Sequence, residues 1–391
     1  KKDGLLLTQS GITNLYADQD GFVWISYSYS EIPDYARTEN VGVNVWDGVK
    51  LRTITEEDGL SGNTSFRTYQ DSQKRIWIAA SKGITMVNKI LNSDGEMILK
   101  IKSIPEESGK PYSTSNILET SAGDIYAWEN YVRPAADKLV ESDYYLGKFD
   151  GEKFVGIKSP FSNSDNESKY RLFNLLEDND RRLWFIGIFA ETIKDISSAH
   201  SKIMLYDGKS WTKPPESWNV PSDQLHYVGK LKNGMYFLTV GGFYVFNGNS
   251  FVNLIDSVNA NADFRILKGA SVAGTKTDIQ AGDNLYIRLR GRGLVIFDGT
   301  NLNFYTKKDG LPSADLSNPV LDHFRETVYF SSPLGSIKTE GSKFQLFPTD
   351  ENIATGVPSS STLDGFGNMV LFFNGVGLYI YKSEQKNYPL K

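Results

Sequence analysis

A motif that returns about every 49 residues constrains the fold of this chain more than any other feature. In each copy an acidic turn precedes a short strand-like run that contains one aromatic or apolar marker residue. The eight markers are Trp24, Trp77, Tyr126, Trp184, Tyr236, Tyr286, Tyr329 and Val370. Periods of roughly 40–50 residues with strand-like content are typical of propeller blades. We therefore expect an all-β fold in which residues 1–391 form a single β-propeller domain.

A second landmark follows the marker in six copies. Each has an acidic or amide residue and a glycine, with an apolar residue three positions further on. These pairs are Asp47-Gly48, Asp150-Gly151, Asp207-Gly208, Asn247-Gly248, Asp298-Gly299 and Glu340-Gly341. Such pairs favour a type I′ hairpin turn. Each copy is therefore predicted to form four antiparallel strands A–D, which in the first copy cover residues 12–18, 22–28, 41–47 and 50–55. A lone four-stranded sheet cannot cover both of its faces, so the marker is expected to be buried between neighbouring sheets.

The chain length of 391 residues divided by the repeat predicts eight blades, with seven as the alternative. The segment KKDGL occurs at residues 1–5 and again at 307–311, and EEDGL occupies residues 56–60. Both internal copies lie between a predicted strand D and the next strand A. We therefore interpret residues 1–5 as a linker, and residues 386–390 as a candidate outer strand of the last blade.

The acidic turns resemble metal loops at first sight, as in residues 15–25, LYADQDGFVWI. A calcium loop needs more oxygen ligands than the copies retain, because the second copy has only Asp71 before SQKR. Aspartate and glycine are also common turn residues for conformational reasons. We predict turns, with no metal and no cofactor. The absence of cysteine excludes disulfides, thiolate metal sites and a cysteine nucleophile.

The repeat resembles the two-component regulator propeller repeat. The matching residues are Gly59-Leu60, Asp71, Ile76-Trp77-Ile78, Gly83-Ile84, and Gly310-Leu311 with Asp322. This resemblance implies a ligand-sensing propeller that is periplasmic or otherwise extracytoplasmic and acts with a membrane histidine kinase region or a partner protein. The sequence contains no kinase histidine motif and no apolar run of about 20 residues that could span a bilayer. The resemblance thus leaves two readings open, a sensor region of a kinase or a stand-alone relative.

Candidate ligand residues come from the predicted B–C loops, which should project from one face. Long loops on a rigid scaffold tend to carry function, and here they span residues 29–40, 129–143 and 188–200. The candidates are Tyr27, Tyr29, Tyr35, Arg37, Trp128, Tyr131, Arg133 and Lys194, with Arg288, Arg290 and Arg292 at the B–C hairpin of the sixth copy. Aromatic planes suit sugar faces, and arginine binds carboxylates or sulfates through two hydrogen bonds. We therefore expect an oligosaccharide or another small ligand.

Three classes of function remain open. The first is a non-catalytic sensor, whose ligand would alter the association of two such domains, so that a homodimer is one candidate state. The second is a protein-binding scaffold, secreted or lipoprotein. The third is a carbohydrate-active hydrolase or lyase, but His200, His226 and His323 form no recognisable catalytic motif and no carboxylate pair stands out. A net charge of −5, from 42 basic and 47 acidic residues, disfavours nucleic acid as a partner.

Overall fold

The protein is described by a computed structural model. It describes residues 2–7, 12–27, 42–91, 93, 97–105, 116–128, 131–132, 146–161, 170–190, 200–221, 225–231, 234–239, 242–254, 259–260, 278–281, 284–289, 291–316, 319–322, 327–348, 358, 360–373 and 377–381. The chain divides into two compact units, one formed by Lys1–Gln70 with Val258–Lys391 and the other by Asp71–Ser257.

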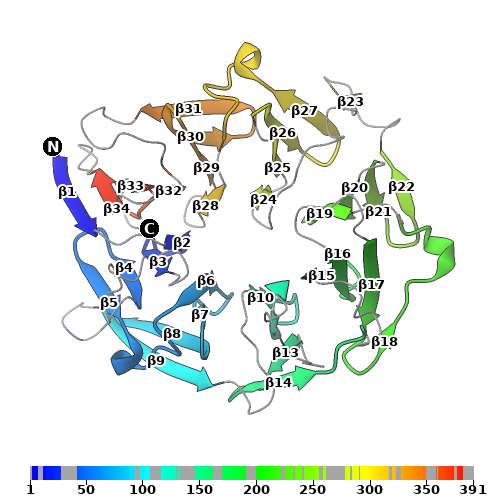
Figure 1. The fold of residues 1–391 in the computed structure, drawn as a ribbon, viewed down its shortest axis with the longest axis horizontal. Helices are drawn as coiled ribbons and strands as arrows, with labels where there is room; N and C mark the ends of the chain where they lie inside the picture. Colours follow the sequence, from blue (N-terminus) through cyan, green and yellow to red (C-terminus); the bar gives the residue numbers. More distant parts are fainter. Residues whose placement is uncertain are drawn as a thin grey trace. The chain divides into compact units, whose positions relative to one another are not determined.

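The fold is all-β and is built from four-stranded antiparallel blades of the propeller type (Figure 1). The second unit contains β7 (Ile76–Ala80), β8 (Gly83–Leu91) and β9 (Met97–Pro105); then β10 (Asn116–Glu119), β11 (Ile125–Trp128), β13 (Leu146–Phe149) and β14 (Phe154–Ile157). It continues with β15 (Tyr170–Glu177), β16 (Leu183–Ala190), β17 (His200–Tyr206) and β18 (Trp211–Thr212), with β12 (Tyr131–Val132) beside β15. The last set is β19 (Leu225–Leu231), β20 (Gly234–Thr239), β21 (Phe243–Phe246) and β22 (Phe251–Asn253).

The first unit has the same construction. One sheet contains β1 (Lys2–Leu7), β34 (Gly377–Tyr381), β33 (Met369–Phe373) and β32 (Ser360–Leu363) in that order. Another contains β24 (Asp278–Ala281), β25 (Asn284–Leu289), β26 (Gly293–Phe297) and β27 (Asn301–Tyr305), with β23 (Asn259–Ala260) beside β27. A sheet of eight strands combines β2 (Ile12–Ala17), β3 (Val23–Tyr27), β4 (Val43–Trp46) and β5 (Leu51–Ile54) with β28 (Val320–Asp322), β29 (Thr327–Ser332), β30 (Gly335–Glu340) and β31 (Lys343–Pro348). β6 (Ser65–Gln70) ends this unit.

The sheet count differs from the predicted blade count. Among the described residues there are seven sheets, six of single-blade size and one of eight strands, so the separate single-blade sheets are fewer than the eight or seven blades expected. The seventh is the eight-stranded sheet, in which β2 and β28 join through one parallel pair, Ala17 with Asp322. The halves β2–β5 and β28–β31 therefore form one sheet, because β2 and β28 lie close enough for backbone pairing.

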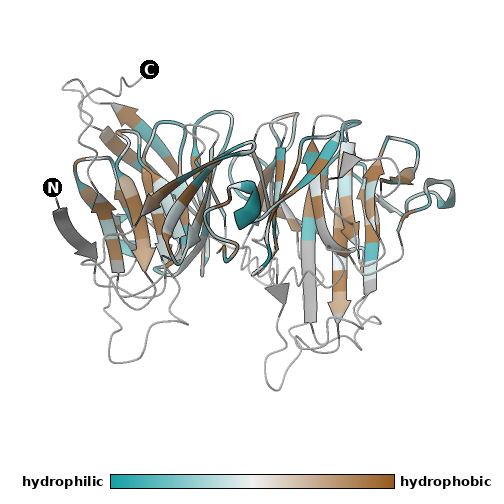
Figure 2. Ribbon diagram, turned by 90° about the horizontal axis from the view of Figure 1, so that it is seen from above, coloured by the Kyte–Doolittle hydropathy of each residue, from teal (hydrophilic) through white to brown (hydrophobic). Residues whose placement is uncertain are grey.

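The predicted burial of the marker residues is confirmed. All eight are at most 3 % exposed, and Trp24, Trp77 and Trp184 are at 0 %. Trp184 on β16 illustrates the packing, because its ring meets Phe246 of the adjacent sheet edge-on, with the ring centroids 4.9 Å apart. Hydrophobic residues concentrate along the strands and hydrophilic residues along the turns (Figure 2). The repeating marker is thus the residue that holds neighbouring sheets together.

The C–D turns are not of the predicted type I′. That type needs positive φ at both central residues, but only the glycine has it, as in Gly48 (92°) and Gly208 (95°). The preceding aspartate instead accepts hydrogen bonds with its side chain. Oδ1 of Asp207, for example, accepts from the backbone N–H groups of Lys209 and Ser210 at 2.8 and 2.7 Å. A carboxylate that replaces a backbone acceptor removes the need for left-handed backbone at that residue.

The end of the last blade is also built differently from the prediction. Its outer strand is β1, which pairs antiparallel with β34 (Figure 1), so residues 1–5 do not form a linker. The segment that we expected in this place, residues 386–390, lies outside the described residues. The two internal copies do form linkers, each as a 3-10 helix, Glu56–Asp58 and Lys307–Asp309. A third such helix covers Glu216–Trp218.

Candidate functional site

In four copies the predicted turn between strands A and B is an aspartate-centred clasp, around Asp18, Asp71, Asp178 and Asp364, whereas Thr120 takes the place of the aspartate in the third copy. In the first copy Oδ1 of Asp18 accepts hydrogen bonds from the backbone N–H groups of Asp20 and Phe22, and Oδ2 accepts from Nε1–H of Trp24 at 2.8 Å. Asp71 with Trp77 and Asp178 with Trp184 repeat this geometry, at 2.7 and 2.8 Å. The residues that carry the sequence resemblance thus occupy equivalent positions in three blades.

The last copy preserves the clasp although Val370 replaces its tryptophan. Oδ1 of Asp364 accepts from the backbone N–H groups of Phe366 and Asn368. Oδ2 accepts from Nε1–H of Trp46 at 2.6 Å, so strand β4 of the first copy supplies the indole. Because its oxygens are engaged in holding the turn, each carboxylate has a structural role. Among the residues that the structure describes, no cluster of three or more histidine and acidic side chains could hold a metal ion.

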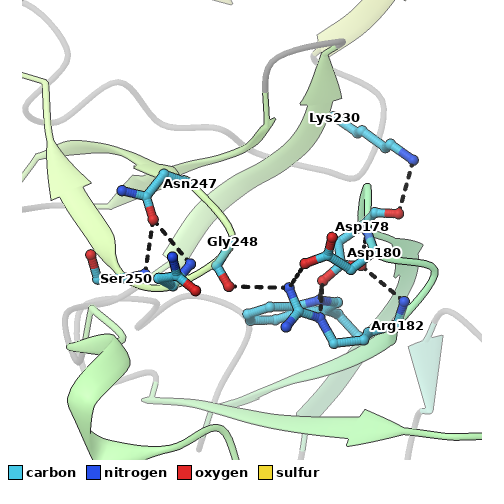
Figure 3. Close-up of polar contacts among 9 residues, drawn as sticks. Asp178, Asp180, Arg182, Lys230, Asn247, Gly248 and Ser250 are labelled. Atoms are coloured by element: carbon cyan, nitrogen blue, oxygen red, sulfur yellow. Dashed lines mark hydrogen bonds and ion pairs between the residues drawn. The ribbon is translucent and has the colours of Figure 1, made fainter.

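Two clasps carry an additional cation, Arg75 at Asp71 and Arg182 at Asp178, and the second is drawn in Figure 3. The guanidinium of Arg182 lies 2.6 Å from Oδ2 of both Asp178 and Asp180, and it donates to the carbonyl oxygen of Gly248 at 3.4 Å. It also lies over the ring of Trp218, 4.8 Å from the centroid. These contacts link the A–B turn before β16 to the C–D turn after β21. Arg182 therefore connects two neighbouring sheets through ion pairs, a hydrogen bond and a cation–π contact.

Of the predicted ligand residues, Tyr27 and Trp128 have a packing role. Tyr27 is at 0 % exposure within the core around β3, and Trp128 is at 5 % within the core that includes Phe161 and Phe185. Every residue of β3 and β11 is buried, so both faces of these strands are covered and both aromatic rings lie in the interior. These two residues belong to the cores rather than to loop surfaces.

The remaining ligand residues divide between described and undescribed parts. Arg288 lies on β25, where Nη1 donates to the carbonyl oxygen of Leu316 at 2.8 Å. Arg292 is exposed in the turn between β25 and β26, as expected for a hairpin. Tyr131 is in the short strand β12. Tyr29, Tyr35, Arg37, Arg133, Lys194 and Arg290 lie outside the described residues, as does His323. His200 begins β17 and His226 lies on β19. Of the third predicted B–C loop, residues 188–190 belong to β16, and residues 191–199 lie outside the described residues.

A hollow in the second unit was not anticipated from the sequence. Its volume is about 710 Å³, and it lies where β13 and β14 face β17 and β18. It is lined by Asp124, Lys148, Phe149, Asp150, Val155, Gly156, Ile157, Lys158, Tyr206, Lys209 and Trp211. Ligand sites are concave and combine apolar or aromatic side chains with a few polar or charged groups that orient the ligand. We take this hollow as the candidate functional site.

The indole of Trp211 in the hollow is held by several contacts. Trp211 is the cross-strand partner of Tyr206, and their ring centroids lie 4.6 Å apart. Its ring also packs on buried Phe185 at 5.5 Å, and Nε1–H donates to the carbonyl oxygen of Lys158 at 2.8 Å. The hydroxyl of Tyr206 donates to the carbonyl oxygen of Gly208, and burial, followed by the nearby charge of Asp207, raises the pKa of Tyr206. The wall is therefore an uncharged aromatic surface.

Charged side chains surround this aromatic wall. Nζ of Lys148 lies 2.8 Å from Oδ2 of Asp124, and both side chains are more than 40 % exposed. Oδ1 of Asp150 accepts from the N–H groups of Glu152 and Lys153, and hydrogen bonds from Lys153 and then Glu152 lower the pKa of this carboxyl group. In sequence the available signal was Trp211 itself, the one tryptophan at a position that leucine or phenylalanine fills in the other copies.

Comparisons with known proteins give the following similarities. No family model and no curated protein matches the chain. It is similar to the extracellular domain of the hybrid two-component system BT3049 from B. thetaiotaomicron, with 13 % identity and a TM-score of 0.36, over 94 % of this chain and 56 % of that one. It is similar to an acylaminoacyl peptidase from Pyrococcus horikoshii, with 11 % identity and a TM-score of 0.48, over 88 % and 53 %. YCF48 from Cyanidioschyzon merolae gives 12 % identity and 0.42, over 96 % and 97 %.

These comparisons leave the activity of the chain open. The chain spans only about half of the first solved structure named here, so the activity of that whole protein does not transfer to it. Identities of 11–13 % carry no information on activity. No helix in the described part of the chain is long and apolar enough to cross a membrane.

Proposed function

We propose that residues 1–391 form one propeller that acts as a non-catalytic, extracytoplasmic ligand sensor for a two-component signalling protein. The observation that carries this proposal is the hollow between β13–β14 and β17–β18, where a fixed indole and several lysines surround about 710 Å³. Pockets of 300–1,000 Å³ are of the size that holds small ligands. The resemblance of the repeat to regulator propellers supports the signalling role, and an oligosaccharide is the ligand class that suits an aromatic wall.

The first test is a thermal-shift screen of the whole chain against neutral, uronic and sulfated oligosaccharides and small carboxylates, with calcium as a separate arm. A ligand that binds only the folded state raises the melting temperature further as its concentration increases, with the stabilisation growing as the logarithm of concentration above Kd. We expect stabilisation by at least one saccharide and none by calcium. Stabilisation by none of these compounds would contradict the sensor proposal and favour a scaffold that binds protein.

A second measurement addresses where the ligand binds and whether it is consumed. Trp211→Ala should abolish the ligand-induced rise in melting temperature. Arg292→Ala, at the β25–β26 turn, tests the alternative site on the face predicted to carry the B–C loops. Loss of binding only in Arg292→Ala would move the site to that face. Incubation with the ligand followed by chromatography should return it unchanged, and new products would establish an enzyme instead.

Signal transfer is proposed to occur through association of two copies or with a kinase region. A ligand can shift an association equilibrium only by its difference in affinity for the two states. Small-angle scattering at saturating ligand should therefore show a change in apparent mass. An unchanged mass would rule out ligand-dependent association of two copies.

A further inference from the structure

The charges of the hollow are unevenly matched. The hollow is lined by three lysines and two aspartates, of which Asp124 pairs with Lys148 and Asp150 accepts from two backbone N–H groups, so the lysines exceed the aspartates by one. The ammonium groups of Lys158 and Lys209, both on exposed residues, have no carboxylate partner among the described residues. Two lysines therefore remain available to an anion from outside the protein.

The same lysines are tied to the aromatic wall. The backbone carbonyl of Lys158 accepts the indole N–H of Trp211, and Lys209 lies in the turn that joins β17 to β18. Because its N–H is already used and Phe185 and Tyr206 support its ring, Trp211 offers the hollow an apolar ring surface in a fixed position. The ring of Trp211 and the ammonium groups of Lys158 and Lys209 thus come from two short segments that flank the hollow, the end of β14 and the β17–β18 hairpin.

We propose that this hollow binds a ring-shaped ligand with an anionic group, an acidic saccharide that stacks on Trp211 and pairs its carboxylate or sulfate with Lys158 and Lys209. This inference rests on the proposed sensor function and specifies the ligand class of the same site. A charged partner strengthens a hydrogen bond about twofold over a neutral one. A neutral saccharide can use only the aromatic surface, so it binds more weakly.

Isothermal titration of the whole chain tests this inference with three matched ligands, a uronic oligosaccharide, a sulfated oligosaccharide and a neutral one of equal length. We expect at least one anionic ligand to bind roughly 10-fold more tightly than the neutral ligand, a difference of about 1.4 kcal/mol, because charge-assisted hydrogen bonds are stronger than neutral ones. Raising the salt concentration should narrow this difference, since salt screens exposed charges. The arm that binds more tightly identifies carboxylate or sulfate.

Substitutions test whether Lys158 and Lys209 pair with the anionic group of the ligand. Lys158→Gln and Lys209→Gln should each weaken the anionic ligand roughly 3-fold, because together they account for its roughly 10-fold preference, and should leave the neutral ligand unchanged. Lys100→Gln on β9 is the matched control, because Lys100 is also exposed but does not line the hollow. Trp211→Ala should weaken all three ligands, and melting temperatures confirm that each variant is folded.

The outcomes separate the two proposals. Equal affinity for neutral and anionic ligands, with both lysine variants unchanged, would overturn the anionic assignment and leave the sensor function standing. Tight anionic binding that Lys158→Gln and Lys209→Gln do not affect would place the anion elsewhere and overturn this site. Absence of binding by all three saccharides would overturn the ligand class, and the small-carboxylate arm of the thermal-shift screen then decides whether the sensor proposal also fails.

Discussion

At the scale of single residues, the same carboxylate performs one task in several blades. In Asp18, Asp71 and Asp178 one oxygen orders the turn and the other accepts the indole N–H of the marker tryptophan. A buried carboxylate is costly unless hydrogen bonds satisfy it. The tryptophan therefore contributes packing and also satisfies the acid, which explains why aspartate and tryptophan recur together six residues apart.

This coupling predicts non-additive substitution effects in the second copy. Trp77→Phe removes the indole donor to Oδ2 of Asp71 and leaves Nε of Arg75 as its other donor, and we expect a loss of about 1–3 kcal/mol in the free energy of unfolding because the lost hydrogen bond is to a charged group. Asp71→Ala should cost more, because the carboxylate also accepts from the backbone N–H groups of Gln73 and Arg75. The double variant should cost less than the sum of the single variants, as measured by urea unfolding. Strict additivity would show that the two residues act independently.

A glycine pair makes another residue-scale prediction. Gly21 has φ of 84°, and a Cβ atom there would lie 2.3 Å from Cα of Gly365, whose N–H donates to the Gly21 carbonyl. Gly208 also has positive φ, but no atom lies within 4 Å of its Cβ position. Gly208→Ala should cost about 1–2 kcal/mol from backbone strain alone. Gly21→Ala should cost about 1–3 kcal/mol more from the clash, and equal losses in thermal unfolding would argue against this close approach.

At the scale of elements, adjacent copies are linked by a side chain that precedes each turn. Gln70 accepts from the N–H of Gln19 with Oε1, and Glu119 and Glu177 accept from Ser72 and Ser121 with both carboxylate oxygens. In each case the acceptor lies one residue before the first residue of a turn, and the donor is the second residue of the turn in the preceding copy. The link therefore repeats in step with the blades and fixes the end of each strand A.

The C–D turns predict a dependence of stability on pH. Hydrogen bonds from Ser210 and then Lys209 lower the pKa of Asp207. The carboxylate therefore stabilises the fold above its unfolded-state pKa of about 3.9, and this contribution is lost as the pH falls through the lower folded-state pKa. Asp207→Asn should show a smaller loss of melting temperature between pH 5 and 3 than the parent chain. Asn247 makes the same backbone contacts, so Asn247→Asp should show a larger loss.

Sequence reasoning recovered the blades because each depends on local, periodic signals. The marker residues, the turns and the four strands per copy follow from patterns within one repeat. The turn type was wrong because a side chain can substitute for a backbone acceptor, as Asp207 does. The hollow was missed because Lys148, Lys158 and Trp211 meet only after two sheets pack, and no spacing in the sequence records that meeting.

At the scale of the whole molecule, the first and last segments of the first unit are joined in several places. β1 pairs with β34, Trp46 binds Asp364, and Gly21 contacts Gly365. The segment KKDGL shows why the sequence alone misplaces this junction. At 307–311 Thr306 caps a 3-10 helix and Gly310 ends it at φ of 89°, whereas at residues 2–5 the same letters belong to a strand. The free edge of β34 determines that conformation, and local propensity does not.

Two deletions test which segment forms the outer strand next to β34, residues 1–7 or residues 386–391. Removing residues 1–7 takes away β1 and its pairing of Lys2, Asp3 and Leu7 with β34. A few lost hydrogen bonds at roughly 0.5–1.5 kcal/mol each should lower the free energy of unfolding by about 2–4 kcal/mol. The uncovered edge of β34 should also promote association, because an unpaired strand is a template for further pairing. Calorimetry and size-exclusion chromatography measure both effects. Removing residues 386–391 should leave both unchanged, and a larger loss from this second deletion would restore the outer strand that the sequence predicted.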